Sequence, residues 1–427
     1  MVKGTHSEAD DSRAAASRPT APTHRPGRTA GLSQVLETGV TVLRRKLSAG
    51  ELGSLPVVLV LAAVWITFQS LNDSFLSPRN LSNLSVDIVG TGLIAVGIVF
   101  VLLIGELDLS VGSVSGLAAA VFAVLNVNNG VPEWLALILA VLTGTVAGTV
   151  QGYSVAKTRV PAFVVTLAGL LTFNGLMLYI LGTSGTVNLD ENGLVARLTS
   201  HYFTNDAAAY ALAAVGTGLV FLVSRQDRRR RMAVGMPHRT FRGIVVRTAV
   251  LAAVAFTAAY LLNRFQGLPL ALLIFLVVVA GLDIVLRRTH YGRQVYALGG
   301  SIEAARRASL NVTGVQTAVL AVSGTMAALG GLFLASRITS VSQGAGSGLL
   351  LLNAIAAAVI GGTSLFGGRG TTWSAVLGML VIQSIASGMV ITDTPTAVQF
   401  MITGGVLFAA VVIDALARRS QEAHGRA

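Results

Sequence analysis

The sequence predicts an all-α fold, a polytopic membrane protein with about twelve transmembrane helices. Of its 427 residues, 53% are hydrophobic and only 12% are charged, about half the charged fraction of a typical soluble domain. The apolar residues form stretches such as 55–71, 88–105 and 268–286. Each is close to the roughly 20 residues that a helix needs to cross about 30 Å of hydrocarbon. These observations exclude a soluble enzyme.

The apolar stretches divide the chain into three regions. Residues 1–50 are polar, so we expect a disordered cytoplasmic tail and no cleaved signal peptide. Residues 51–420 form the transmembrane domain, and 421–427 a second cytoplasmic tail. The stretches 111–127 and 351–366 are candidates for broken or re-entrant helices. The expected spans are roughly 55–71, 87–105, 111–127, 134–156, 161–182, 207–223, 244–262, 268–286, 314–335, 351–366, 372–391 and 397–416.

The basic residues predict the orientation of the chain. With the N-terminus inside, 27 of the 31 Lys and Arg residues fall in cytoplasmic segments, as the positive-inside rule requires. Both termini are therefore predicted to be cytoplasmic. Two long connections, the basic loop 224–243 and the loop 287–313, lie on the same side. This distribution explains the net charge of +12, so we expect no nucleic-acid partner.

Composition excludes several kinds of chemistry. The chain has no cysteine, so it has no disulfide, thiol nucleophile or thiolate metal site. Its six histidines lie outside the apolar stretches and lack metal-ligand spacing. No lysine follows a glycine, so the Gly-Lys-Ser/Thr sequence of a phosphate-binding loop is missing. We therefore expect no cofactor on this chain, and any ATP that drives it must be hydrolysed by another chain.

Ionisable side chains at membrane depth are costly and are functional candidates by default. The candidates are Glu106, Asp108, Asp283 and Asp414. Asp283 and Asp414 are each followed one turn later by arginines near a cytoplasmic helix end, so local ion pairing explains them. No basic residue lies near Glu106 or Asp108, so pairing along the chain does not explain these two.

The segment 105–113 separates two apolar stretches. The pattern that begins at Asp108 resembles the start of a helix, where side-chain oxygens cap free backbone N–H groups. The small or polar residues that follow Asp108 are Ser110, Gly112 and Ser113. A polar break flanked by glycine is also what a discontinuous helix on a translocation path needs. Capping and packing, or direct participation in the path, both stay open for this segment.

A second glycine-rich break, 361–370, likewise separates two apolar stretches and begins with Gly361, Gly362 and Thr363. The two breaks are hypothetical counterparts in related halves of the chain. Uncharged polar residues inside the spans either line a path or form interhelical hydrogen bonds. They are Gln151, Asn174, Asn353 and Gln383.

Glycines also recur at helix-packing spacing in the fourth span, at Gly144, Gly148 and Gly152. Residues four apart lie on one helical face. Because lipid supplies no hydrophobic force between helices, a glycine face stabilises packing by letting two backbones approach closely. We therefore expect helix packing there and no substrate role.

In the stretch 287–313, Gly299 and Gly300 break the chain, and Ser301 is placed to N-cap a short helix. The helix would contain Glu303, Ala304, Ala305 and Arg306. A short polar helix on the cytoplasmic face suits docking against a soluble partner. A solvated loop helix fits these residues equally well.

At these residues the chain resembles the membrane-spanning permeases of ABC sugar importers, in the ribose/xylose/galactoside branch. The motifs that carry the resemblance follow the family's order between about residues 75 and 416. They are the segments 108–113, 292–293 with 299–300, 303–306 and 361–365. Glu106, the segment 160–169 and the basic insertion around 228–242 are similar to the xylose-type permeases.

The resemblance implies roles and partners. Gly299, Gly300 and the segment 303–306 would form a coupling helix in a groove of a separate ATPase subunit, which binds the ATP. An extracytoplasmic binding protein would deliver a monosaccharide, xylose or a relative, to the outer loops. Two copies of the permease would flank one path through a bacterial inner membrane. The chain departs from the family at 308–310, where it has Ala-Ser-Leu and relatives usually have Ser-Gly-Ile.

Two other classes of protein fit parts of the sequence. A proton-coupled transporter of the major facilitator type also has twelve spans, cytoplasmic termini and a basic loop after span six. That class is expected to carry basic residues between spans two and three, whereas 105–113 has none. A membrane enzyme such as a glycosyltransferase would need converging carboxylates or histidines, and only Glu106 and Asp108 are available. We therefore expect a transport subunit and no enzyme.

Overall fold

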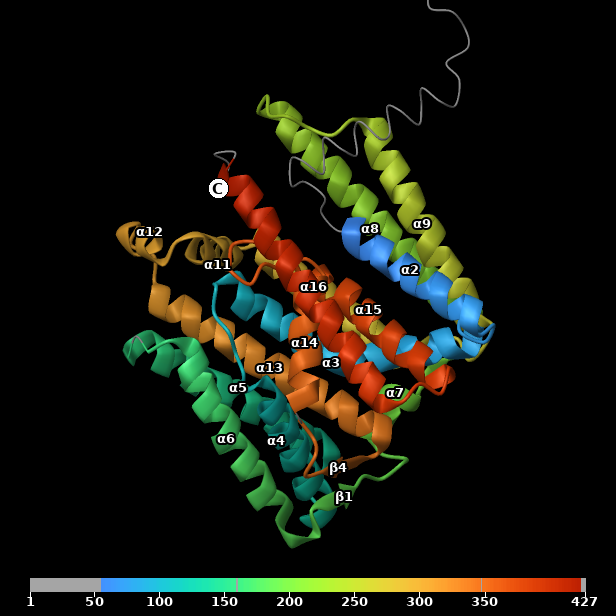
Figure 1. Ribbon diagram of the computed structural model, residues 1–427, viewed down its shortest axis with the longest axis vertical. Helices are drawn as coiled ribbons and strands as arrows, with labels where there is room; N and C mark the ends of the chain where they lie inside the picture. The colour runs from blue at the N-terminus through green and yellow to red at the C-terminus, as the bar shows by residue number, and fades with distance from the viewer. Residues whose placement is uncertain (1–54, 159, 347, 424–427) are drawn as a thin grey trace, which may run out of the picture. The chain divides into compact units, whose positions relative to one another are not determined.

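The computed structural model describes residues 55–158, 160–346 and 348–423. The predicted tail 1–50 and the last four residues of the predicted tail 421–427 lie outside these described residues. The described residues belong to one compact unit, and most of them form helices (Figure 1).

Most of the helices are joined by short connections. In chain order they are α2 (Leu55–Leu71), α3 (Pro78–Leu103), α4 (Val111–Ala123), α5 (Glu133–Thr158), α6 (Ala162–Leu181), α7 (Leu194–Ser200), α8 (Asp206–Ala233), α9 (Phe241–Asn263), α10 (Leu270–Arg288), α11 (His290–Gly300), α12 (Ile302–Arg307), α13 (Val312–Ile338), α14 (Gly348–Ile360), α15 (Thr372–Ile391) and α16 (Thr396–Ala423). The π-helix η1 (Val124–Asn128) extends α4, and the 3₁₀ turn η2 (Gly182–Ser184) follows α6. Antiparallel strand pairs join β1 (Thr186–Asn188) to β4 (Ser340–Ser342), and β2 (Tyr202–Phe203) to β3 (Leu268–Pro269).

Nine helical stretches in the described part of the chain are long and apolar enough to cross a membrane. They are α3, α4 with η1, α5, α6 with η2, α8, α9, α10, α13 and α15. Shorter apolar helices lie in α2, α14 and α16. Each of the twelve predicted spans overlaps one of these helices, although α14 ends six residues before the predicted span 351–366 does. The predicted polytopic all-α fold is confirmed.

Helix α3 forms the centre of the bundle. Every residue from Ile88 to Leu103 is buried, because the helix is apolar all round and other helices surround it. Helix α13 packs against α3, α4 and α5, while α14 and α15 also pack against α3. In contrast, α6, α8 and α9 leave most of their spans unburied, as expected for helices that face lipid.

The glycine face of α5 packs against α13, as predicted. A Cβ atom on Gly148 would collide with the carbonyl of Leu320 in α13. A Cβ atom on Gly144 would collide with the carbonyl of Gly324, which itself packs against the Gly144 carbonyl. Since only glycine leaves room for this backbone approach, these residues hold α5 and α13 together.

The two spans that are candidates for broken helices are both short. Helices α4 and α14 each contain 13 residues, about 20 Å at 1.5 Å per residue and less than the roughly 30 Å of hydrocarbon. Helix α4 gains length through η1, whereas irregular backbone follows α14 as far as Thr371. Irregular backbone at membrane depth needs cover from other protein segments.

The basic connection 224–243 is more helical than its polarity indicates. Helix α8 continues to Ala233 and α9 begins at Phe241, so only seven residues, 234–240, link the two helices. Arginine, glutamine and methionine are good helix formers, which accounts for the extension of α8 beyond its apolar part. The two helices pack along each other as a hairpin (Figure 1).

Candidate functional site

The carboxylate of Asp108 lies in the break between α3 and α4 and is only 4% exposed. Its Oδ1 atom accepts hydrogen bonds from the backbone N–H of Ser110 (2.9 Å) and the hydroxyl of Ser110 (2.7 Å). Its Oδ2 atom accepts one from the hydroxyl of Ser323 in α13 (2.9 Å). Three donors therefore offset the cost of burying this carboxylate, and they attach the break to α13.

The structure corrects the prediction that side-chain oxygens cap α4. Ser110 is the N-cap residue, but its hydroxyl makes no capping hydrogen bond. That hydroxyl bonds to Asp108 instead, and the carboxylate closes a turn before the helix begins. The side chains of this break thus serve tertiary contacts, which sequence spacing does not reveal.

Helices α5 and α6 contact the same break. The Ser110 hydroxyl lies 3.0 Å from Oε1 of Gln151 in α5. The backbone N–H of Leu109 donates to the hydroxyl of Thr166 in α6 (3.2 Å). The Nε2 atom of Gln151 is buried and has no hydrogen-bond partner among the described residues. Gln151, Asp108 and Ser323 form one buried polar cluster where α4, α5 and α13 meet.

The other predicted residues of the first break lie around this cluster. Glu106 is half-buried, and its carboxylate accepts a hydrogen bond from the backbone of Ala162. Gly112 and Ser113 are buried in the first turn of α4. A Cβ on Gly112 would lie 2.8 Å from the carbonyl of Gly346, so this turn packs closely against the chain that leads into α14.

The second break contacts both α3 and α11. The backbone N–H of Gly368 donates to the carbonyl of Leu103 at the end of α3 (2.9 Å). Gly299, near the end of α11, packs so closely on the same carbonyl that a Cβ there would collide with it. Tyr296 of α11 donates its hydroxyl to the carbonyl of Gly370 (2.8 Å). We call these five residues the glycine junction.

The two tyrosines of α11 differ in their surroundings. Burial raises the pKa of Tyr296, so its hydroxyl stays protonated and donates to Gly370 throughout the physiological pH range. Burial raises the pKa of Tyr291 to about 12, yet its hydroxyl has no hydrogen-bond partner in the described part of the chain. Tyr296 thus ties α11 to the second break by a side-chain hydrogen bond.

The three predicted residues at the start of the second break differ in burial and in backbone conformation. Gly361 is buried against the carbonyl of Ser374 in α15. Gly362 has a φ of 99°, a conformation that favours glycine. Thr363 is 1% exposed, and its hydroxyl has no partner among the described residues. Its backbone N–H donates to Ala358 and closes the end of α14.

Helix α12 presents a polar surface, as predicted. Ser301 is its N-cap and accepts a hydrogen bond from the backbone N–H of Ala304 (3.2 Å). Ala305 is buried, whereas Gly300, Glu303, Ala304 and Arg306 are exposed. The helix is thus held by its N-cap and by the buried side chain of Ala305, and its charged side chains are exposed to solvent.

The residue that departs from the family pattern adopts a strained backbone. Ser309 has a φ of 58°, in the left-handed region where glycine has no steric penalty. Its backbone N–H donates to Arg306, and the next residue, Leu310, donates to Ala305. The loop after α12 therefore adopts a turn that favours glycine, although it has a serine there.

Asn174 does not join the other candidate residues. It is exposed on α6, outside the polar cluster and the glycine junction. The predicted ion pair of Asp283 forms with Arg287 (2.8 Å), whereas the side chain of Asp414 lies outside the described part. An ion pair that the sequence does not reveal joins Asp87 of α3 to Arg337 of α13 (2.8 Å), since the two residues are far apart in the chain.

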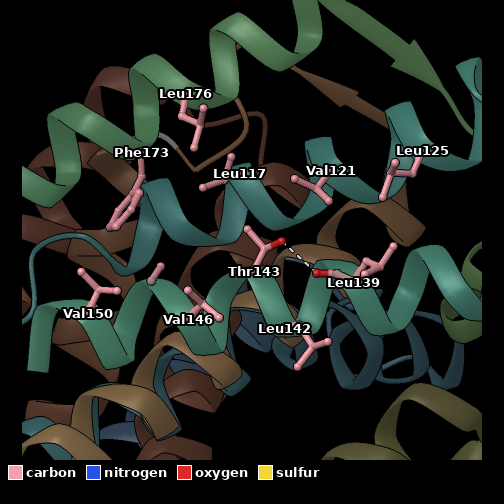
Figure 2. A pocket seen from close by; sticks show the side chains of 11 residues that line it. Leu117, Val121, Leu125, Leu139, Leu142, Thr143, Val146, Val150, Phe173 and Leu176 are labelled. Atoms are coloured by element: carbon pink, nitrogen blue, oxygen red, sulfur yellow. Dashed lines mark hydrogen bonds between the residues drawn. The ribbon is translucent and has the colours of Figure 1, made fainter. Parts of the chain in front are cut away.

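An apolar groove of about 510 Å³ lies between α4, α5 and α6 (Figure 2). Ten of its eleven lining residues are apolar. The exception, Thr143, donates its hydroxyl to the Leu139 carbonyl of its own helix (2.8 Å). A sugar needs several hydrogen-bonding groups, so this groove suits hydrocarbon and not a sugar.

A second hollow, of about 640 Å³, has charged and polar residues in its lining. It lies beside α7 and is lined by Glu133, Asp190, Asn192, Gly193, Leu194, Arg197, Leu198, His201 and Leu270. The Glu133 carboxylate accepts a hydrogen bond from the backbone of Leu194 at the start of α7. The predicted orientation puts this hollow on the extracytoplasmic side.

A bundle of apolar helices interrupted at two packed breaks, with a polar helix held beside one of them, is the architecture of a membrane permease. The chain belongs to the family described as branched-chain amino acid transport system / permease component, whose model matches residues 80–411. The predicted resemblance to the permease subunits of ABC importers is thereby confirmed.

Three relatives show how far the similarity extends. The xylose transport system permease protein XylH of Escherichia coli (strain K12) is 37% identical over 363 residues, 85% of this chain and 90% of the relative. XylH of Haemophilus influenzae is 37% identical over 361 residues, 84% of this chain and 95% of the relative. The ribose import permease protein RbsC of Bacillus subtilis (strain 168) is 30% identical over 365 residues, 86% of this chain and 94% of the relative. No solved structure matches the chain.

These matches decide between the classes of protein that the sequence left open. The relatives are permeases, so the expectation of a multi-pass transport subunit and not an enzyme is confirmed. The major facilitator alternative finds no support in the matches.

Proposed function

We propose that the chain is the permease subunit of an ATP-driven, binding-protein-dependent importer of xylose or a related monosaccharide. The observation that carries the proposal is its 37% identity with a xylose permease over 85% of the chain. The sugar path then runs through the helical bundle, and the apolar groove of Figure 2 is not part of it.

Coupling to the ATPase runs through α12. Its exposed residues, Glu303, Ala304 and Arg306, enter a groove of the partner, which binds and hydrolyses the ATP. Gly299 and Gly300 connect α12 to the glycine junction, where α11 meets the end of α3 and the second break. A displacement of α12 therefore moves the ends of two membrane helices together, as rigid-body alternating access requires.

The cofactor of the transporter belongs to the partner chain. No lysine of this sequence follows a glycine, so a phosphate-binding loop is missing. We propose that this chain binds neither a cofactor nor nucleic acid. The energy of ATP reaches it only as motion of α12.

On the opposite side, the hollow beside α7 receives the sugar-binding protein. Its Glu133, Asp190 and Arg197 provide charges of both signs for a complementary protein surface. Both termini then lie in the cytoplasm of a bacterial cell, on the side of the coupling helix. The distribution of Lys and Arg, with 27 of 31 inside, supports this orientation.

A second copy of the chain completes the path. Asn174 is exposed on α6, and an exposed amide at hydrocarbon depth is costly. A second permease copy or the aqueous path between the copies would cover it. Around the first break, the buried Asp108 cluster holds the helices and does not contact the sugar.

Uptake of labelled D-xylose tests the proposed function. We compare the native host with a clean deletion of this chain and with the deletion strain carrying the gene. The proposal predicts loss of high-affinity xylose uptake on deletion and its return with the gene. Unchanged xylose uptake would remove xylose as substrate, and a panel of other monosaccharides would then identify the sugar.

A further inference from the structure

The turn between α8 and α9 concentrates unpaired positive charge. We call residues 225–247 the arginine hairpin, because they contain eight arginines and one carboxylate, Asp227. Asp227 pairs with Arg288 of α10 (3.3 Å). Among the described residues, no arginine of the hairpin forms an ion pair with a carboxylate. The hairpin therefore presents a field of cationic groups that the chain itself does not neutralise.

The length of α8 sets the height of these groups. At 1.5 Å per residue, Arg225 lies about 28 Å along the helix from Asp206, and Arg231 about 38 Å. The hydrocarbon layer is about 30 Å thick. With Asp206 at the outer boundary of the hydrocarbon and α8 along the membrane normal, the arginines 228–231 fall in the headgroup layer and not deep in the cytoplasm. On α9, Arg242 stands in the first turn and returns to the same layer.

Apolar side chains are exposed among the arginines. Met232, Val234, Met236 and Phe241 are 46% to 70% exposed, and all lie in or beside the turn. Exposed apolar groups beside cationic ones suit the boundary between acyl chains and headgroups. Helices α8 and α9 pack mainly against each other and leave most of their spans unburied, so lipid surrounds the hairpin on most sides.

We propose that the arginine hairpin binds the anionic phospholipid headgroups of the leaflet into which it projects. The positive-inside rule explains the sign of the charge in this connection, but not its clustering at headgroup height beside exposed apolar residues. Guanidinium groups bind phosphate oxygens in a bidentate manner. In Figure 1 the turn is well separated from α12, so the surface is distinct from the one proposed for the ATPase.

The test uses the full-length chain in a non-ionic detergent. Native mass spectrometry measures its affinity for phosphatidylglycerol and, in parallel, for phosphatidylcholine of the same acyl length. The variant is R229Q/R230Q/R231Q. Arg228 is kept because its guanidinium lies over the ring of Phe241, 5.8 Å from the ring centre. The matched control, R293Q/R307Q/R369Q, removes three exposed arginines outside the hairpin.

We expect wild type and control to bind phosphatidylglycerol at least tenfold more tightly than phosphatidylcholine. In the hairpin variant the affinity for phosphatidylglycerol should fall about tenfold or more, while the affinity for phosphatidylcholine stays unchanged. The reason is that each arginine near an anionic surface contributes substantially to the binding free energy. R229K/R230K/R231K should keep most of the affinity for phosphatidylglycerol, which separates loss of charge from misfolding.

Three results would overturn the proposal. One is an unchanged phosphatidylglycerol preference in the hairpin variant. Another is displacement of bound phosphatidylglycerol by inorganic phosphate as effectively as by the same concentration of added lipid. That result would indicate a site for free anions. The third is loss of the co-purifying ATPase from the hairpin variant while its lipid preference persists, which would make the hairpin a protein-binding surface.

Discussion

Asp108 shows what a buried carboxylate requires and how much of that a sequence reveals. The sequence identifies the residue and the polar break around it, because no basic residue lies nearby in the chain. It does not reveal Ser323, which donates to the carboxylate from 215 positions away. Capping is a local pattern, so the sequence favours it here, but the actual contacts depend on how α4 and α13 pack.

Replacing Asp108 should affect folding more than sugar selectivity. Asp108→Leu leaves the backbone N–H of Ser110 and the hydroxyl of Ser323 without their acceptor, and charge-assisted hydrogen bonds contribute about 1.5–3 kcal/mol each. We expect a several-fold lower yield of folded protein by size-exclusion chromatography. Asp108→Asn retains an acceptor oxygen and should be milder. A well-folded Asp108→Leu protein with an altered sugar preference would refute the structural role.

Ser309 offers an opposite prediction, a gain of stability. Glycine at its φ of 58° relieves steric strain, and a left-handed conformation costs a non-glycine residue roughly 1 kcal/mol. Ser309→Gly should therefore raise the thermal unfolding midpoint of the purified chain by one to a few degrees. Ser309→Ala, which keeps a Cβ atom, should give no such gain. Equal midpoints for the two variants would count against strain at this turn.

At the scale of elements, short sequence patterns correctly predicted the features that depend on neighbouring residues. Ser301 caps α12 as expected, and the α5 glycines pack as their spacing indicates. The length of α8 was not predicted, because the charge of the arginines 228–231 resembles that of a loop while their helix propensity favours a helix. The glycine junction could not be predicted from the sequence, since it joins three segments that are separated by many residues.

Tyr296 tests the glycine junction. Tyr296→Phe removes the hydrogen bond to the Gly370 carbonyl, worth about 1 kcal/mol. We expect unchanged amounts of protein in the membrane and sugar uptake reduced several-fold. Tyr291→Phe is the matched control, because its buried hydroxyl has no partner among the described residues. Equal uptake by the two variants would show that the junction does not transmit motion.

At the scale of the whole molecule, the account joins two regions that the sequence presents separately. The predicted coupling segment and the second break meet the end of α3 in one junction. The first break begins directly after α3, so the same helix leads from the junction to the Asp108 cluster. Motion at α12 therefore has a continuous protein route to the centre of the bundle.

Reversal of the charge at Glu303 tests that route most directly. Glu303 is exposed on α12, so Glu303→Arg should leave the chain folded and inserted while sugar uptake is abolished. Gln226→Arg, which adds a positive charge at an exposed position on α8, should leave uptake unchanged. The measurement is labelled sugar uptake by cells with equal amounts of each variant in the membrane. Normal uptake by Glu303→Arg would contradict the proposal that α12 couples this permease to its ATPase.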